Sequence, residues 1–524
     1  MNNITSFTLA ILLLPPAWLH AADVPQARPN VVFILADDLG WSDTTLYGTT
    51  KFFETPNIER LAKRGMTFAN AYAANPLCSP TRASIMTGEY PARVGITLPC
   101  CHEPEVRLEE RMVAKAPPYQ HALQMSSVSR LKTDYYTLAK AFQDADYATG
   151  HFGKWHLGPE PYSPLQHGFD VDVPHWWGPT HAGPYVAPWK FPPKLNFTGQ
   201  PGEHLEDRMG SEAIKFIKAN KQHPFFLNYW AFSVHMPFDG KTNLITKYRA
   251  KADPNDPQRC PVYGAMVQSL DENVGRLLDT LDALKLTDNT IIVFFSDNGG
   301  DMYDRVDGIP PTSNAPLRGG KAMPYEGGTR EPCVVVWPGK VKPGSRSDAL
   351  LSSVDWYPTL LEMAGVQPKQ KVKFDGVSQT PALLGTGAPR ETVFCYFPHY
   401  MPAIGVSPTT WIRRGDWKLI RFFCDNPDQS DRFELYNLKD DIGETKNLAA
   451  EQSERVKELD SLIDGFHKNT GALIPAKNPT FNLNAKMHRV GEKPAKHSPP
   501  PKQSSPDARI ELERESDEGM SVGS

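Results

Sequence analysis

The 524-residue chain lacks several features that would assign it to particular classes of protein. It has no dense run of Lys and Arg, and its net charge is −4, so we expect no nucleic-acid partner. None of its seven cysteines forms a C-x-x-C pair, which argues against a zinc site. Beyond the N-terminal segment no stretch is long and apolar enough to span a membrane. The rest of the composition, 40% hydrophobic and 22% charged, is typical of a globular protein with a large core.

Residues 1–22 have the pattern of a secretory signal peptide. The stretch 7–14 is mostly apolar, and Ala21-Ala22 provides small residues for cleavage before Asp23. No Lys or Arg precedes the apolar stretch, which is also shorter than a membrane anchor and is followed by Pro15-Pro16. No cysteine for a lipid anchor follows it. We therefore expect a secreted or periplasmic protein.

Apolar runs alternate with helical patterns over most of the chain. Residues 30–36, 225–231 and 290–295 are nearly continuously apolar, as strands buried on both faces of a parallel sheet must be. A helical pattern at 267–281 and a helix from Thr55-Pro56 to Arg64 lie between them. This alternation predicts an α/β domain over residues 23–385, with a large, mostly parallel or mixed central sheet flanked by helices.

The composition changes near residues 380–392. Short strand-like runs follow at 392–397, 409–413, 417–422 and 433–436, and then a helical pattern at 452–466. We expect a smaller α+β domain with an antiparallel sheet over residues 386–483. Residues 484–524 are polar and rich in Pro, Ser and Glu, a composition typical of a disordered tail.

Acidic side chains follow two of the predicted strands. Asp37 and Asp38 come after the strand at 30–36, and Asp297 and Asn298 follow the strand at 290–295. Because ligand sites form beyond the carboxyl ends of parallel strands, these pairs can converge at one edge of the sheet. Their oxygen atoms suit Ca²⁺ or Mg²⁺. Taken alone, each pair is better explained as caps of turns and helices, and only the combination with the other motifs favours a cation site.

Basic and nucleophilic residues occur in four further motifs. Cys78 begins the run C-S-P-T-R, which ends at Arg82 and opens a helix-like stretch whose start suits an anion. Lys154 and His156 lie in the block G-K-W-H-L-G and project to the same side of an extended segment. His235 follows the strand at 225–231. The fourth motif is the run Arg318-Gly319-Gly320, which Lys321 follows. Each motif alone is also compatible with ordinary packing or a solvated loop.

Together these motifs resemble type I sulfatases of the alkaline phosphatase superfamily, over about residues 28–470. The C-x-P-x-R run, its following T-G pair and the G-K-W-H-L-G block are the most specific elements. The resemblance implies an alkaline phosphatase-like fold. It also implies that a formylglycine-generating maturation enzyme oxidises Cys78 to Cα-formylglycine, the hydrate of which attacks sulfur.

The same resemblance assigns the remaining residues. Asp37, Asp38, residue 78, Asp297 and Asn298 would bind one cation, Ca²⁺ with Mg²⁺ still open. The charge of the sulfate would be neutralised by Arg82, Lys154 and Lys321. Asp297 would take the proton of the attacking hydroxyl, His156 would take a proton as sulfate leaves, and His235 would protonate the leaving oxygen.

We therefore expect an arylsulfatase-like enzyme that cleaves the S–O bond of a sulfated small molecule or carbohydrate. The alternatives are a phosphonate or phosphodiester hydrolase and a catalytically silent binder of sulfated glycans. An insertion over residues 98–130 matches no assigned element and is a candidate pocket wall. Further pocket candidates, which equally fit the core or the surface, are His175, Trp176, Trp177, Trp411 and Arg413. The oligomeric state is left open.

Overall fold

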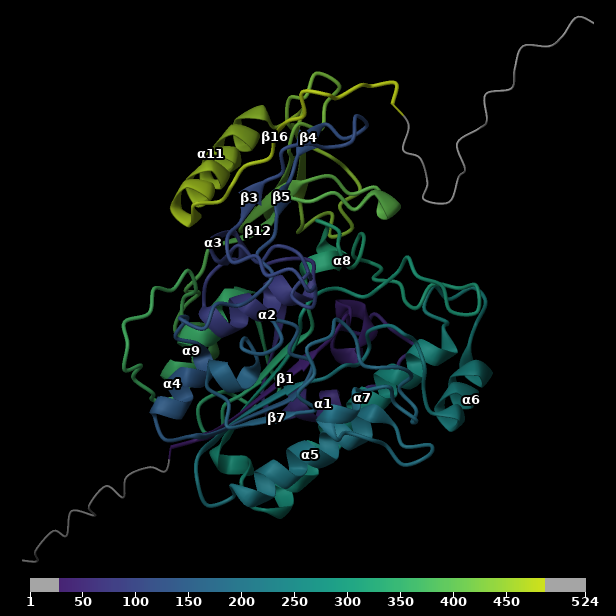
Figure 1. Ribbon diagram of the computed structural model, residues 1–524, viewed down its shortest axis with the longest axis vertical. Helices are drawn as coiled ribbons and strands as arrows, with labels where there is room; N and C mark the ends of the chain where they lie inside the picture. The colour runs from purple at the N-terminus through teal and green to yellow at the C-terminus, as the bar shows by residue number, and fades with distance from the viewer. Residues whose placement is uncertain (1–27, 486–524) are drawn as a thin grey trace, which may run out of the picture.

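An eight-stranded sheet forms the centre of the computed structural model, which describes residues 28–485 (Figure 1). The strand order is β11-β2-β10-β9-β1-β8-β6-β7, and only β10 runs antiparallel to its neighbours. The strands are β1 (Asn30–Ala36), β2 (Met66–Tyr72), β6 (Ala148–Gly153), β7 (Val171–Val173), β8 (Phe225–Trp230), β9 (Thr290–Ser296), β10 (Cys333–Val336) and β11 (Ser345–Ser352). The predicted α/β fold with a mostly parallel sheet is confirmed. The expected signal peptide and nearly all of the expected tail lie outside the described residues.

Helices cover both faces of this sheet, which explains its continuously apolar strands. Val31, Phe33 and Leu35 of β1 belong to one hydrophobic cluster, and Val32 and Ile34 to another on the opposite face. The first cluster includes residues of α2 (Cys78–Thr87), α4 (Leu138–Asp144) and α9 (Trp356–Ala364), and the second includes residues of α1 (Pro56–Arg64), α5 (Leu205–Ala219) and α7 (Pro261–Ala283). Shorter helices are α3 (Pro91–Val94), α6 (Thr242–Lys251), α8 (Glu326–Thr329) and α10 (Thr380–Leu383). Among the described helices, none is both long and apolar enough to cross a bilayer.

A second, four-stranded antiparallel sheet lies near the C-terminus, as expected. It consists of β12 (Thr392–Phe397), β13 (Thr409–Arg414), β14 (Trp417–Phe422) and β15 (Arg432–Asn437), in that order. Helix α11 (Ser453–Thr470) packs on it through Leu459 and Ile463. Figure 1 shows this unit at one end of the molecule, beyond α2 and α8. The residue numbers at which we divide the two domains remain predictions.

The insertion at residues 98–130 forms short ladders instead of a helix or a long strand. It contains β3 (Arg111–Met112), β4 (Ala122–Leu123) and β5 (Met125–Ser126); β3 pairs with β5, and β4 pairs with β16 (Ala476–Lys477). Arg130 holds the start of the insertion by donating to the carbonyl oxygen of Cys101 at 2.9 Å. All seven cysteines lie in the described residues, and all are free thiols.

A buried ionic cluster joins the two sheets. The ammonium group of Lys418, on β14, lies 2.9 Å from carboxylate oxygens of both Glu326 and Glu444. Arg330 contacts the second oxygen of Glu326 at 2.7 Å, and the hydroxyl of Tyr72, on β2, donates to it at 2.7 Å. Because the cluster fixes the start of α8, it also anchors the loop that carries Lys321.

We expect Lys418→Met to lower the free energy of unfolding by about 3–5 kcal/mol, because it leaves two buried carboxylates with one cation fewer. Urea denaturation of the purified protein measures this change. Lys457→Met is the matched control, since Lys457 forms only an exposed pair with Glu454 and should cost about 0.5 kcal/mol or less. Equal destabilisation by the two substitutions would contradict the assignment of the cluster as the link between the sheets.

Candidate active site

The polar residues singled out in the sequence gather beyond the carboxyl ends of β1, β6, β8 and β9. Asp37 and Asp38 directly follow β1, and Asp297 and Asn298 directly follow β9. These strands are parallel neighbours, so the two pairs meet: Asn298 Nδ2 donates to Asp38 Oδ1 at 2.8 Å, and the amide of Asp38 donates to Asp297 Oδ1 at 3.2 Å. The expected convergence of the two acidic pairs is therefore present.

Cys78 is the first residue of α2. Its side chain is buried against the cluster of Asp37, Asp38, Asp297 and Asn298, which we call the acidic group. Its Sγ atom lies 3.9 Å from Asp38 Oδ1, and no histidine nitrogen of the described residues hydrogen-bonds to it. Burial raises the pKa of the Cys78 thiol above its usual range. A buried thiol that stays protonated is a poor nucleophile.

Arg82, one turn further along α2, is fully buried and ties the site together. Its Nε donates to Asp297 Oδ2 at 2.8 Å, and one terminal nitrogen donates to the carbonyl oxygen of Lys154 at 2.6 Å. Its guanidinium group also lies over the ring of Trp230, 5.2 Å from the ring centroid. These contacts hold the charge of Arg82 in one place between α2, β6 and β9.

Two lysines neutralise the first acidic pair. Lys154 Nζ lies 2.6 Å from Asp37 Oδ2, and Lys321 Nζ lies 2.6 Å from Asp38 Oδ2. Burial alone would raise the pKa of Asp38, but the surrounding positive charges, which include Lys321 and Lys154, lower it below its usual range. The site therefore combines carboxylates with a matching set of fixed cations.

His235 completes this face of the site as a neutral acceptor. Its Nδ1 donates to the carbonyl oxygen of Met236 at 2.7 Å, which leaves Nε2 to accept from Lys321 Nζ at 2.9 Å. Burial lowers the pKa of His235 to about 3, so the ring carries no charge at neutral pH. Lys321 and His235 thus form a pair that can pass a proton to a bound oxygen.

The acidic group has the atoms needed to bind a divalent cation. One ligand atom from each of Asp37, Asp38, Cys78 and His235 lies within 4.8 Å of the others. In addition, Asp37 Oδ1 and Asn298 Oδ1 are buried and accept no hydrogen bond from the described residues. Buried oxygen atoms without donors fit a hard cation such as Ca²⁺ or Mg²⁺. Asp297 contributes less here, because Arg82 contacts its carboxylate.

A residue that the sequence did not indicate reaches the site from the insertion. Nδ1 of His102 lies 3.1 Å from Nε2 of His156, so one ring donates a hydrogen bond to the other. Nδ1 of His156 is buried without a partner among the described residues. An unpaired buried N–H is costlier than an unpaired acceptor, so the proton belongs on Nε2 of His156 and leaves Nδ1 free. The insertion therefore takes part in the site, as a residue of its own contacts His156.

Two of the other pocket candidates are structural. Trp411 is fully buried and packs edge-on against Tyr72, and Arg413 donates to Asn70 Oδ1 at 2.9 Å. Both lie in β13, where it packs against the central sheet, so the interpretation as core residues is the correct one. His175, Trp176 and Trp177 do line a cavity, which lies at the end of β7.

Comparison with known proteins places the chain among the sulfuric ester hydrolases. A family model described as "Sulfatase" matches residues 29–366, and one described as "N-sulphoglucosamine sulphohydrolase, C-terminal" matches residues 320–468. The chain belongs to the sulfatase family. It is 31% identical to N-acetylgalactosamine-6-sulfatase of Homo sapiens, over 88% of this chain and 89% of that protein. It is also 31% identical to arylsulfatase A of Bos taurus, over 89% and 92% of the two chains.

Solved structures agree with this assignment. The crystal structure of Ps i-CgsB in complex with k-i-k-neocarrahexaose matches with a TM-score of 0.68 and 25% sequence identity. The match covers 88% of this chain and 95% of that one. The family and the fold inferred from the sequence motifs are therefore confirmed.

We expect His102→Ala to change the protonation pattern of the His156 ring, because it removes the partner of Nε2. NMR of protein labelled with ¹⁵N-histidine measures this, with the His156 signals assigned through His156→Gln. The unsubstituted protein should show His156 protonated at Nε2. His121→Ala is the control, since His121 lies in the same insertion but packs on Phe481. An unchanged His156 spectrum in the His102 variant would refute the contact.

Proposed function

We propose that this sulfatase hydrolyses sulfate monoesters of a carbohydrate by S–O cleavage, with residue 78 as formylglycine and a divalent cation, Ca²⁺ or Mg²⁺, in the acidic group. The observation that carries the proposal is the placement of Cys78. It lies at the start of α2, among carboxylates, two lysines and Arg82, where burial raises the pKa of its thiol and keeps it protonated. A cysteine in these surroundings makes chemical sense as the precursor of another nucleophile.

The formylglycine hydrate, once a maturation enzyme has formed the aldehyde, supplies one hydroxyl that attacks sulfur and a second that allows sulfate to leave by elimination. The cation would be held by Asp37, Asp38, Asp297, Asn298 and residue 78, and would add positive charge next to the ester oxygens. The remaining steps depend on the side chains of this chain.

Fixed charges of the protein hold the sulfate. Lys154 and Lys321 place their ammonium groups against the carboxylates of Asp37 and Asp38, and Arg82 fixes the carboxylate of Asp297. In a site shielded from water, fixed charges stabilise the developing negative charge more strongly than solvent does. Asp297 would accept the proton of the attacking hydroxyl.

Two histidines handle the other protons. The Lys321–His235 pair would deliver a proton to the leaving oxygen, since the two nitrogens lie 2.9 Å apart. His156, with its free Nδ1, would accept a proton as the sulfate departs. Because every position of this machinery is present, an inactive glycan-binding protein is the weaker hypothesis, and the family assignment favours sulfate over phosphate esters.

The relatives support a carbohydrate substrate. Several are described as N-acetylgalactosamine-6-sulfatases or N-acetylgalactosamine-6-O-sulfatases, in mammals and in Bacteroides thetaiotaomicron, and Ps i-CgsB was solved in complex with k-i-k-neocarrahexaose. We therefore propose a sulfated sugar as the substrate of this chain. We also propose that the protein is exported, on the basis of residues 1–22 alone.

We expect Cys78→Ala to abolish hydrolysis of an aryl sulfate such as p-nitrophenyl sulfate while the protein stays folded. The substitution removes the precursor of the nucleophile from a site that the surrounding ion pairs still hold together. Rates of p-nitrophenol release and the thermal unfolding midpoint measure the two effects. Retained turnover in this variant would exclude residue 78 as the nucleophile.

Mass spectrometry of the peptide that contains residue 78 tests the modification itself. Conversion of cysteine to formylglycine replaces the CH₂–SH group by an aldehyde, a loss of about 18 Da in protein from a host with the maturation enzyme. An intact thiol in fully active protein would contradict the proposal. Arg82→Lys is a useful companion variant, because it keeps the charge but loses the two-sided contact with Asp297 and Lys154.

A further inference from the structure

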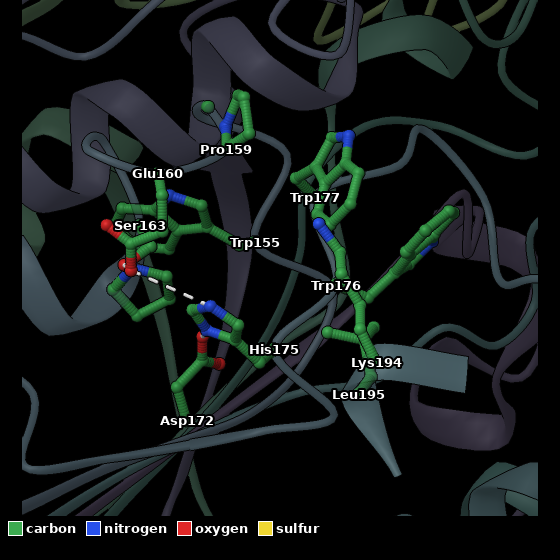
Figure 2. A pocket seen from close by; sticks show the side chains of 12 residues that line it. Trp155, Pro159, Glu160, Ser163, Asp172, His175, Trp176, Trp177, Lys194 and Leu195 are labelled. Atoms are coloured by element: carbon green, nitrogen blue, oxygen red, sulfur yellow. Dashed lines mark hydrogen bonds and ion pairs between the residues drawn. The ribbon is translucent and has the colours of Figure 1, made fainter. Parts of the chain in front are cut away.

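A cavity of about 330 Å³ lies at the end of β7 (Figure 2). It is separate from the group of charged residues described above, Asp37, Asp38, Asp297, Arg82, Lys154 and Lys321, which we call the ionic site. Its walls come from the segment after β6, from the segment after β7 and from residues 194–195. The side chains that line it include Trp155, Glu160, Asp172, His175, Trp176, Trp177 and Lys194. This volume is at the lower end of the range of small-molecule sites, enough for one or two sugar rings.

His175 is held in a fixed orientation at the floor of this cavity. It adopts a left-handed backbone conformation with φ of 61°, which is uncommon for a residue other than glycine. This conformation lets its Nδ1 hydrogen-bond to Asp172 Oδ2 at 2.7 Å, and the Asp172 side chain is only 2% exposed. Nε2 of the ring then points toward Glu160, 3.6 Å from Oε1, as Figure 2 shows. A buried carboxylate that orients a half-exposed imidazole is a typical way to prepare a polar contact.

Two indole rings form the opposite wall. Trp176 and Trp177 lie with ring centroids 4.9 Å apart, and both are partly exposed. Trp176 packs against the hydrophobic core and donates to the carbonyl oxygen of Thr180 at 2.6 Å. Trp177 also lines the cavity, with the ammonium group of Lys194 5.0 Å from its ring centroid. An indole on a cavity wall offers a flat apolar surface to a ligand that has one apolar face.

The cavity carries no excess of positive charge. Asp172 and Glu160 contribute two carboxylates and Lys194 one ammonium group, and His175 adds a positive charge only when both of its ring nitrogens are protonated. The cavity therefore differs from the ionic site, where Lys154, Lys321 and Arg82 gather at one place. It offers donors, acceptors and aromatic rings but no excess of positive charge, which fits a ligand rich in hydroxyl groups that carries no sulfate.

The cavity adjoins the ionic site through the segment 153–158. Strands β6 and β7 are parallel neighbours, with Phe152 paired to Val173, so both end at the same edge of the sheet. Lys154 and His156 face the ionic site, and Trp155 and Gly158 line the cavity. Gly158 is packed so tightly that a Cβ atom there would come within 2.9 Å of Arg130, the residue that anchors the insertion. The wall between the two sites is therefore one short, fixed segment.

We propose that this cavity is a subsite for an unsulfated pyranose ring of the carbohydrate substrate, which stacks on Trp177 and hydrogen-bonds to His175 and Glu160. The proposal rests on the proposed carbohydrate sulfatase function and extends it. In this proposal, residues outside the ionic site recognise the sugar that is next to the sulfated one. The chemical class of the ligand is a neutral hexose or N-acetylhexosamine.

Saturation-transfer NMR with N-acetylgalactosamine tests the subsite on protein that still carries Cys78, so that neither maturation nor turnover enters the result. We expect the sugar to bind with an affinity that falls about tenfold or more in Trp177→Ala, a loss typical of a central aromatic contact. His175→Ala should weaken binding as well. Trp189→Ala is the matched control, because Trp189 is also partly exposed but stacks on Phe197 away from the cavity.

Three results would overturn the proposal. These are no binding at tens of millimolar sugar, equal binding by the Trp177 and Trp189 variants, and stronger Trp177-dependent binding of N-acetylgalactosamine 6-sulfate than of the neutral sugar. Thermal unfolding midpoints identify any variant that fails to fold, and His175→Gln then serves as the milder substitution. Hydrolysis of p-nitrophenyl sulfate by matured protein is measured separately, so failure of the subsite and failure of the proposed function are distinguishable.

Discussion

The structure depends on the neutralisation of carboxylates that are buried at the carboxyl edge of the central sheet. Asp37, Asp38 and Asp297 are each fully or almost fully buried within a few ångströms of one another, an arrangement that the low dielectric of the interior would not tolerate without cations. Lys154, Lys321 and Arg82 provide that charge. Each of these cations comes from a different segment: the end of β6, the 318–330 loop and α2. The buried aspartates are therefore compensated only when the fold brings these three segments together.

This constraint explains why the C-terminal unit is coupled to the site. Lys321 reaches Asp38 from a loop that is fixed at its far end by Glu326, and Glu326 is held in turn by Lys418 of β14 and by Arg330. The antiparallel sheet thus acts on the ionic site through a second buried ionic cluster. The two clusters are built in the same way, because in both a buried carboxylate is paired with cations from distant segments.

The parts of the molecule that the sequence predicted are those with a strong local pattern. Strands β1 and β9 are continuous apolar runs, and the aspartates that follow them could be placed at one edge because parallel strands end together. The antiparallel direction of β10 could not be predicted, because four apolar residues are the same in either direction. The start of β11 could not be predicted either, because its first half carries exposed polar residues at the edge of the sheet and has no continuous apolar run. The insertion was expected only as a candidate pocket wall. Its strands of two residues and the contact of His102 could not be predicted, because both depend on pairing with distant segments.

The segment 153–158 shows how one short stretch can serve chemistry and recognition together. The segment leaves β6 as an irregular turn, in which His156 adopts a left-handed conformation with φ of 54°. This turn places Lys154 against Asp37 and Trp155 on the wall of the cavity. Trp155 is packed against Trp230, with centroids 6.0 Å apart, and Trp230 lies beneath the guanidinium group of Arg82. Close-packed aromatic layers of this kind do not compress. A ligand against Trp155 would therefore meet a wall whose position is set by the same contacts that hold Arg82, and the distance between a bound sugar and the sulfate site is fixed by the core rather than by a flexible loop.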